Sequence, residues 1–106
     1  MAQNHSFMKT IIVFASKDMV LEFFQNRFND PSKKQSYSDI IGGGDSLCFK
    51  LATSGLFKTV TVNFELTFGD SSGRTRLAIK ANSDGDAEKA VRELIKDLEK
   101  QYRVSA

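Results

Sequence analysis

Several basic side chains of this chain of 106 residues stand at alternate positions in segments that switch regularly between apolar and polar residues. Such alternation is typical of a strand with one face on a core and the other in water, so these bases would share the wet face of a sheet. A polar sheet face with excess positive charge suits the phosphate backbone of a nucleic acid. The bases of this predicted face are Lys50, Arg74, Arg76 and Lys80.

The segment between these bases, residues 59–68, would add threonine and asparagine side chains and one acid, Glu65, to the same face. The face lacks the exposed aromatic side chains on which unpaired bases stack, which argues against a reader of single-stranded RNA. Two interpretations stay open: a phosphate-binding surface, or an ordinary solvated face of an antiparallel sheet.

A second set of bases steps by three or four residues near the end of the chain and forms one stripe of a predicted helix. Acids flank this stripe, and pairs such as Glu88 with Arg92 have the spacing and order that stabilise a helix. A solvated, salt-bridged face is therefore favoured over a phosphate-binding ridge. The bases of the stripe are Lys89, Arg92, Lys96, Lys100 and Arg103.

Residues suited to catalysis are scarce. The single histidine, His5, lies near the N-terminus, and the single cysteine, Cys48, has no histidine in an ordered segment to activate it. The glycines Gly42–Gly44 lack the lysine and hydroxyl residue that complete a phosphate-binding P-loop. We therefore expect a protein that is not an enzyme and has no cofactor.

One acidic segment has the spacing of a calcium-binding loop. The position that requires glycine in such a loop is Ala87, and a strand rather than a helix precedes it. A turn from strand to helix, with acids at the helix N-terminus, explains the same residues, so no metal site is expected. The residues concerned are Asn82, Asp84, Asp86 and Glu93.

The composition is that of a single soluble domain, with 41% hydrophobic and 26% charged residues and a formal net charge of +2. The apolar runs are too short to cross a membrane, and the start of the chain lacks the features of a signal peptide. One cysteine agrees with a reducing compartment, so we expect a cytoplasmic protein. The predicted domain covers residues 7–104, after a flexible N-terminus at 1–6.

Periodicity predicts the order β-α-β-β-β-α. The strands are expected at 7–14, 46–53, 59–68 and 74–81, with helices at 16–28 and from the acidic turn to about 103. The polar, glycine-containing segment 29–45 is predicted as a mobile loop. Ser16 is expected to cap the first helix, whose apolar face would hold Met19, Val20, Phe23, Phe24 and Phe28.

A strand-helix-strand start favours a right-handed parallel connection, followed by an antiparallel meander. With both helices on one face, the expected fold is an α+β two-layer sandwich with a four-stranded sheet. Its predicted core consists of Phe23, Phe24, Val60, Val62, Phe64, Leu66, Leu77, Ile79, Leu94 and Leu98.

The predicted order β-α-β-β-β-α and the closing segment, residues 78–101, resemble the ribosome-hibernation factors, also called the sigma-54 modulation or ribosomal subunit interface family. In that family a strand ends in a short acidic turn, and an aspartate opens a helix with an Ala-Ile/Val pair and a Leu-Glu-x-Gln ending. The corresponding residues here are Asp86, Ala90, Val91, Leu94, Leu98, Glu99 and Gln101. The resemblance implies ribosomal RNA of the small subunit as partner, with Lys89, Arg92, Lys96 and Lys100 touching phosphate.

A second hypothesis is a protein-interaction or inhibitor domain without a nucleic-acid role, because the net charge is small and the predicted sheet has open edges. Edge strands carry unpaired backbone groups that natural proteins cover or charge. Lys9 and Thr10 on the first strand, and the segment 74–80 on the last, are the expected guards of the two edges. A partner strand or a second copy of the chain would pair there instead.

Overall fold

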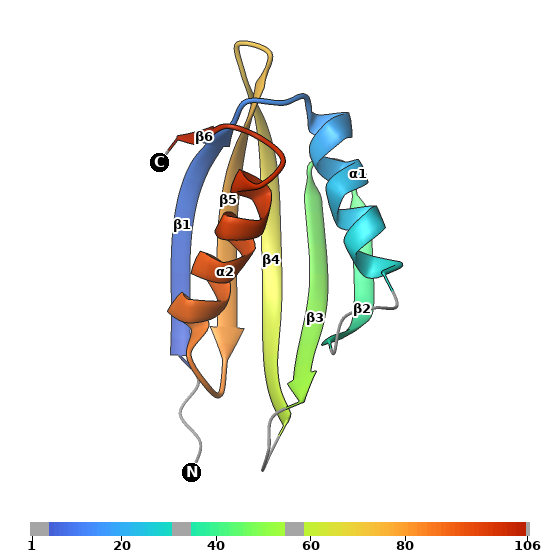
Figure 1. Cartoon of the computed structure of the whole chain (residues 1–106), viewed down its shortest axis with the longest axis vertical. Coiled ribbons are helices and arrows are strands. Elements are labelled where there is room, and N and C mark those ends of the chain that lie inside the picture. The colour runs from blue at the N-terminus through green and yellow to red at the C-terminus, as the bar shows by residue number, and fades with distance from the viewer. Residues whose placement is uncertain (1–4, 31–34, 55–58, 106) are drawn as a thin grey trace.

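The structure is a computed structural model, and it describes residues 5–30, 35–54 and 59–105. These residues form six strands and two helices (Figure 1). In chain order they are β1 (His5–Val13), α1 (Lys17–Phe28), β2 (Gln35–Gly43), β3 (Ser46–Ser54), β4 (Thr59–Ser71), β5 (Arg74–Ser83), α2 (Ala87–Glu99) and β6 (Val104–Ser105).

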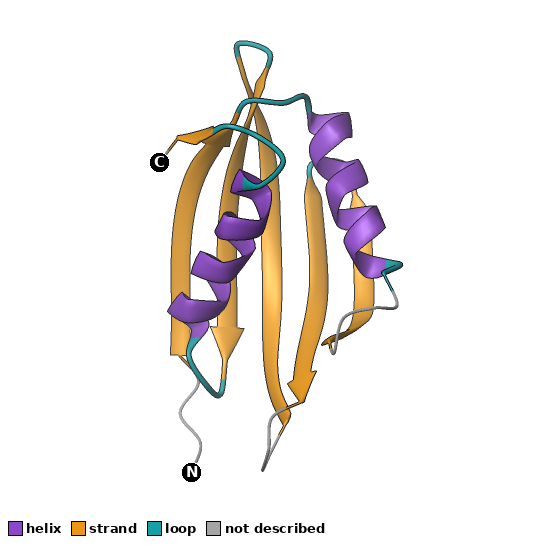
Figure 2. Cartoon of the chain, in the orientation of Figure 1, coloured by secondary structure: helices purple, strands orange, loops and turns teal. Residues whose placement is uncertain are grey.

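The strands form one antiparallel sheet in the order β2-β3-β4-β5-β1-β6. Both helices lie on the same face of this sheet, as Figure 2 shows, so the α+β class is confirmed. The predicted four-stranded sheet is wrong, because β2 and β6 add a strand at each edge. Neither described helix is long and apolar enough to span a membrane.

The predicted parallel connection is also wrong. The strand β1 pairs antiparallel with β5 along its whole length, and its other neighbour is β6. The connection after β1 crosses the end of the sheet, and α1 then runs along the side of the sheet where β3 and the edge strand β2 lie (Figure 1). The strands β1 and β2, which are consecutive in sequence, are therefore separated in the sheet by β3, β4 and β5.

The segment predicted as the loop 29–45 contains the edge strand β2. Its pairing with β3 shifts between Ser38 and Ile41, and Asp39 at this bulge has a φ of 52°. A bulge breaks the alternation of side chains, which hid this strand from the sequence pattern. The segment 74–80 was predicted to guard an edge of the sheet. This prediction is wrong, because β5 lies inside the sheet between β4 and β1.

The hairpin of β4 and β5 confirms the predicted alternation. Ser72 and Gly73 connect the strands with φ values of 54° and 84°, and two positive φ values fit the tight turns of two-residue hairpins. Val60 is only half-buried, unlike the other predicted core positions of this strand. The inward residues of β4 that are buried are Val62, Phe64, Leu66 and Phe68.

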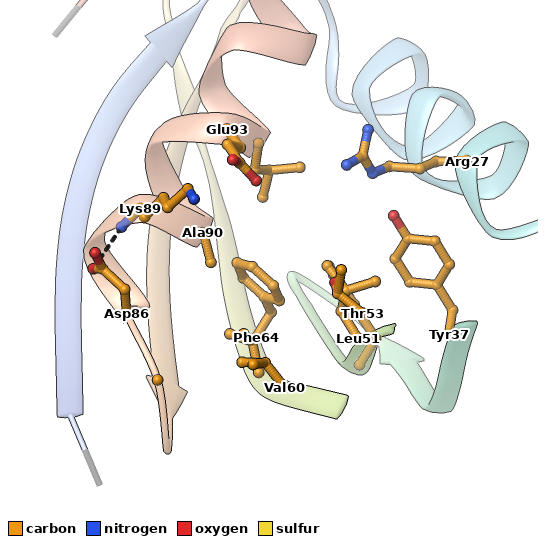
Figure 3. Close-up of a pocket in the computed structure, with 14 residues that line it drawn as sticks. Arg27, Tyr37, Leu51, Thr53, Val60, Phe64, Asp86, Lys89, Ala90 and Glu93 are labelled. Atoms are coloured by element: carbon orange, nitrogen blue, oxygen red, sulfur yellow. Dashed lines mark hydrogen bonds between the residues drawn. The ribbon is translucent and has the colours of Figure 1, made fainter. Parts of the chain in front are cut away.

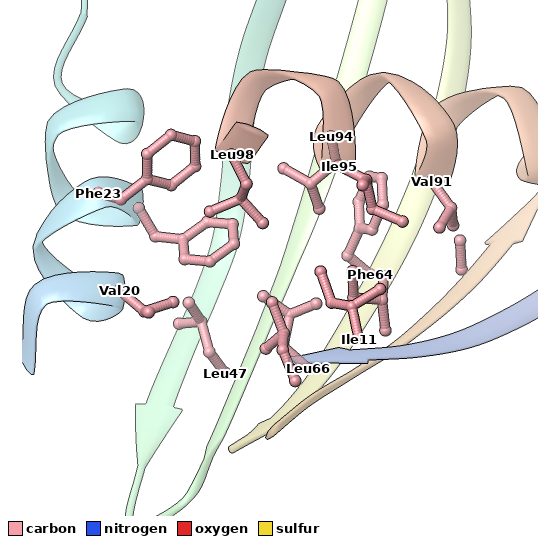
Figure 4. Close-up of a cluster of buried hydrophobic side chains, with 14 of the residues drawn as sticks. Ile11, Val20, Phe23, Leu47, Phe64, Leu66, Val91, Leu94, Ile95 and Leu98 are labelled. Atoms are coloured by element: carbon pink, nitrogen blue, oxygen red, sulfur yellow. The ribbon is translucent and has the colours of Figure 1, made fainter. Parts of the chain in front are cut away.

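The core lies between the sheet and the two helices (Figure 4). Ser16 caps α1 as predicted, since its Oγ accepts a hydrogen bond from the Met19 amide at 3.3 Å. The α1 residues Val20, Phe23 and Phe24 are buried, and α2 contributes Val91, Leu94, Ile95 and Leu98. Met19 was expected in this contact but is 47% exposed.

The last helix is shorter than predicted. Asp86 caps α2 by accepting a hydrogen bond from the Lys89 amide at 3.0 Å, and the helix ends at Glu99. The chain then turns toward β1, where the Phe14 amide donates to the Arg103 carbonyl at 2.8 Å. Arg103 therefore does not extend the helical stripe of bases, because this backbone contact draws it to the edge of the sheet.

Candidate functional site

The face of the sheet opposite the helices is covered by none of the described elements, and we call it the open face. The four bases predicted for a wet face alternate with the buried residues of their strands, so they lie on the open face. These bases are Lys50 on β3 and Arg74, Arg76 and Lys80 on β5.

The part of the open face that holds Lys50 and Lys80 is balanced in charge. The Lys50 Nζ lies 3.3 Å from the Asp39 Oδ2, in an ion pair between neighbouring strands. Lys80 stands directly across from Glu65 in the pairing of β5 with β4. Both bases therefore have an acid beside them, which lowers their attraction for phosphate.

Another part of the open face holds three arginines, two of which lie over one aromatic ring. The guanidinium carbon of Arg74 lies 4.1 Å from the centre of the Phe14 ring, and that of Arg103 lies 5.4 Å from it. Arg76 is the next outward residue of β5 and stands across from Ile12 of β1. We call Phe14, Arg74, Arg76 and Arg103 the arginine end.

Three separate segments build the arginine end: the residue after β1, the start of β5 and the residue before β6. None of its three exposed arginines forms an ion pair with another described residue. Asp70, at the end of β4, instead accepts a hydrogen bond from the Gly73 amide at 3.3 Å. The arginine end thus carries positive charge that no described acid neutralises by direct contact.

The bases of the predicted helical stripe lie elsewhere, because α2 covers the other face of the sheet (Figure 1). Arg92 pairs with Glu88 one turn away, and the Lys100 Nζ lies 3.5 Å from the Asp97 Oδ1. The structure therefore does not unite Lys89, Arg92, Lys96 and Lys100 with the bases of the open face in one surface.

On the helix side, a cavity of about 370 Å³ lies between α2, the end of α1 and strands β2, β3 and β4 (Figure 3). The small side chain of Ala90 on α2 faces this space. Most of the lining is apolar. The apolar residues are Phe49, Leu51, Val60, Val62, Phe64, Ala90 and Leu94, and the polar side chains are Arg27, Tyr37, Thr53, Asp86, Lys89 and Glu93.

Two buried polar atoms mark one end of this cavity. The Arg27 side chain is 9% exposed, and its Nη1 donates to the Asp97 Oδ2 at 2.5 Å. The Arg27 Nε and the Tyr37 hydroxyl have no hydrogen-bond partner among the residues that the structure describes. A buried polar group left in this state costs about 1–3 kcal/mol of stability, so both atoms need an explanation.

Tyr37 is held by aromatic contacts, with its ring centre 5.1 Å from that of Phe28 and 5.7 Å from that of Phe49. Burial raises the pKa of the Tyr37 phenol, against the opposing effect of the nearby Arg27 guanidinium. The hydroxyl is therefore protonated at neutral pH and available as a donor. Sequence analysis missed Tyr37 because it lies in the segment predicted as a loop.

No group of three or more histidine, cysteine, aspartate or glutamate side chains that could hold a metal ion exists in the described part of the chain. Cys48 is half-buried, and Asp86 of the calcium-like segment caps α2. No protein-family model, curated protein or solved structure matches this chain.

Proposed function

We propose that this chain is a non-enzymatic binding protein that contacts the phosphates of structured RNA through the arginine end. The observation that carries this proposal is the group of three exposed guanidinium groups without an ion-pair partner among the described residues. Neutralising phosphate charge is the main source of affinity when a protein binds nucleic acid without reading its sequence.

The arrangement of the arginines supports phosphate as the ligand. Stacking of Arg74 and Arg103 against Phe14 restricts both side chains, so less conformational entropy is lost on binding. A guanidinium stacked by its face keeps its N–H edges free, and those edges match the oxygens of a phosphate. Phe14 is thus a support for the arginines rather than a platform for bases.

The proposed RNA surface contains fewer of the bases than the sequence predicted. Lys50 and Lys80 stand beside acids, and the bases of α2 face away from the open face. The likeness to the ribosome-hibernation family also loses its topological part, because the observed order contains two more strands. The resemblance of the closing strand and helix still supports RNA of the small ribosomal subunit as the ligand. Such a ligand would place the protein in the cytoplasm.

Salt dependence tests the proposal directly. Three phosphate contacts predict that the logarithm of the binding constant falls with the logarithm of salt concentration with a slope of about −2 to −3. The measurement is co-sedimentation with small ribosomal subunits, and fluorescence titration of a labelled RNA hairpin, between about 50 and 300 mM salt. Absence of association at the lowest salt would exclude the RNA function.

A second candidate function is pairing with a protein strand at the edge formed by β1. Within the described residues, β6 covers only Ile12 and Val13 of β1, which leaves the outer side of residues 5–11 without a partner strand. Met8 in this stretch is 68% exposed. An open edge with an exposed apolar side chain is a template for another strand, and a second copy of the chain is the simplest one.

Light scattering at micromolar concentration tests this second function. Self-pairing predicts a dimer that persists in high salt, because backbone hydrogen bonds rather than charges would hold it. Replacing Met8 with lysine should shift the equilibrium toward monomers, since two like charges would meet near the paired edges. A strict monomer at all concentrations would rule out self-pairing and leave only a different protein as partner.

A further inference from the structure

The cavity on the helix side is separate from the arginine end, because the sheet lies between them. Its volume of about 370 Å³ is within the range of pockets that hold small molecules. The apolar part of the wall comes from β3, β4 and α2, which all belong to the core of the domain. The cavity is therefore a property of the packed fold.

The polar end of the cavity offers hydrogen-bond donors. The Arg27 guanidinium is directed toward the space between the helices, and the Tyr37 hydroxyl points to the same region (Figure 3). Asp97 occupies one nitrogen of Arg27, which leaves the Nε–H without an acceptor among the described residues. An oxygen atom of a bound molecule placed here would accept from both groups.

Two donors at this end suit the two oxygens of a carboxylate. The Arg27 N–H and the Tyr37 O–H lie in the same region, and a guanidinium forms strong hydrogen bonds with an anionic oxygen. The four charged side chains that line the cavity, Arg27, Lys89, Asp86 and Glu93, balance one another, so the preference for a carboxylate rests on these two donors. A ligand without an oxygen would leave both donors unsatisfied.

We propose that the cavity binds a small apolar carboxylic acid, whose carboxylate accepts from the Arg27 Nε–H and the Tyr37 O–H. The hydrocarbon part of the ligand lies against Leu51, Val62 and Phe64, on the inner face of the sheet. This site differs from the proposed RNA surface in position, in residues and in ligand.

The test compares octanoate with methyl octanoate, which has the same chain but no charge, by calorimetry and by amide chemical shifts in NMR. Octanoate is expected to bind with a dissociation constant below about 1 mM and about tenfold more tightly than the ester. The shifts should be largest at Val62, Phe64 and Leu94. Equal affinities would overturn the assignment of a carboxylate, and absence of binding by both would overturn the site.

Two variants locate the ligand. Tyr37→Phe removes one hydroxyl without changing the ring, and it should weaken octanoate about tenfold and the ester about threefold or less. Ala90→Leu fills part of the cavity and should weaken both ligands, whereas its matched control Ala78→Leu, on the open face, should weaken neither. Unchanged affinity in Tyr37→Phe would contradict the proposed contact even if Ala90→Leu did not fold.

The result of the octanoate experiments does not depend on whether the chain binds RNA. Neither Tyr37→Phe nor Ala90→Leu lies on the open face, so both variants should bind RNA as the original chain does. Shifts at Arg74, Arg76 or Arg103 on addition of octanoate would show that the carboxylate binds the open face instead, and would overturn the cavity assignment.

Discussion

Replacing Phe24 with alanine is expected to lower the free energy of unfolding by about 3–5 kcal/mol. The Phe24 side chain is completely buried, and its ring centre lies 5.2 Å from that of Phe23 and 6.0 Å from that of Phe49. It therefore joins α1 to β3 in the middle of the core. Removing the ring loses its transfer free energy and leaves a cavity that neighbouring strands cannot close.

Urea unfolding monitored by circular dichroism measures this effect. Because a domain of this size is stable by about 5–15 kcal/mol, the variant should be close to the limit of folding. Met8→Ala is the control, since it removes a side chain that is 68% exposed and should change stability by about 0.5 kcal/mol or less. A loss of about 1 kcal/mol or less in Phe24→Ala would mean that α1 does not pack as described.

Features that depend on neighbours in sequence were predictable. The alternation from Val62 to Phe68 fixed which side of β4 is buried, because a strand that shifts by one residue turns every side chain to the other face. The Ser16 cap of the first helix followed from the need of the first amides of a helix for an acceptor.

Features that depend on distant pairing were not predictable. The sequence of β1 suits either a parallel or an antiparallel neighbour, and its pairing with β5 depends on where α1 returns the chain. β2 was missed because it is a polar edge strand interrupted by a bulge. Such a strand has neither the apolar run nor the regular alternation by which strands are recognised.

The two proposed sites show the same limit. Arg74 and Arg76 were identified because they share the parity of one strand, whereas Phe14 and Arg103 join them only through the contacts of β1 with β5 and β6. Arg27 and Tyr37 come from a helix and from the missed strand, and no spacing in the sequence relates them. A site whose residues come from several elements can be predicted only when the order of the strands in the sheet is known.

The double variant Arg74→Glu with Arg76→Glu is expected to weaken RNA binding about 100-fold at 0.1 M salt. A salt slope of about −0.9 for each contact makes one phosphate contact worth about eightfold at that salt concentration, so two lost contacts account for about 60-fold. Repulsion between the new carboxylates and phosphate adds the remainder. Both positions are exposed, so the fold should be retained.

The matched control is Lys96→Glu with Lys100→Glu, which changes the net charge equally but on the helix side of the molecule. If binding depends on the arginine end, this control should lose little affinity and keep the original salt slope, whereas the arginine variant should show a slope smaller by about 2. Equal losses in the two double variants would mean that overall charge, and not the arginine end, determines binding.

Phe14→Leu separates charge from geometry, because it keeps all three arginines and removes only the ring that orients two of them. Its affinity should fall while its salt slope stays unchanged, since the number of phosphate contacts is the same and only their entropic cost has risen.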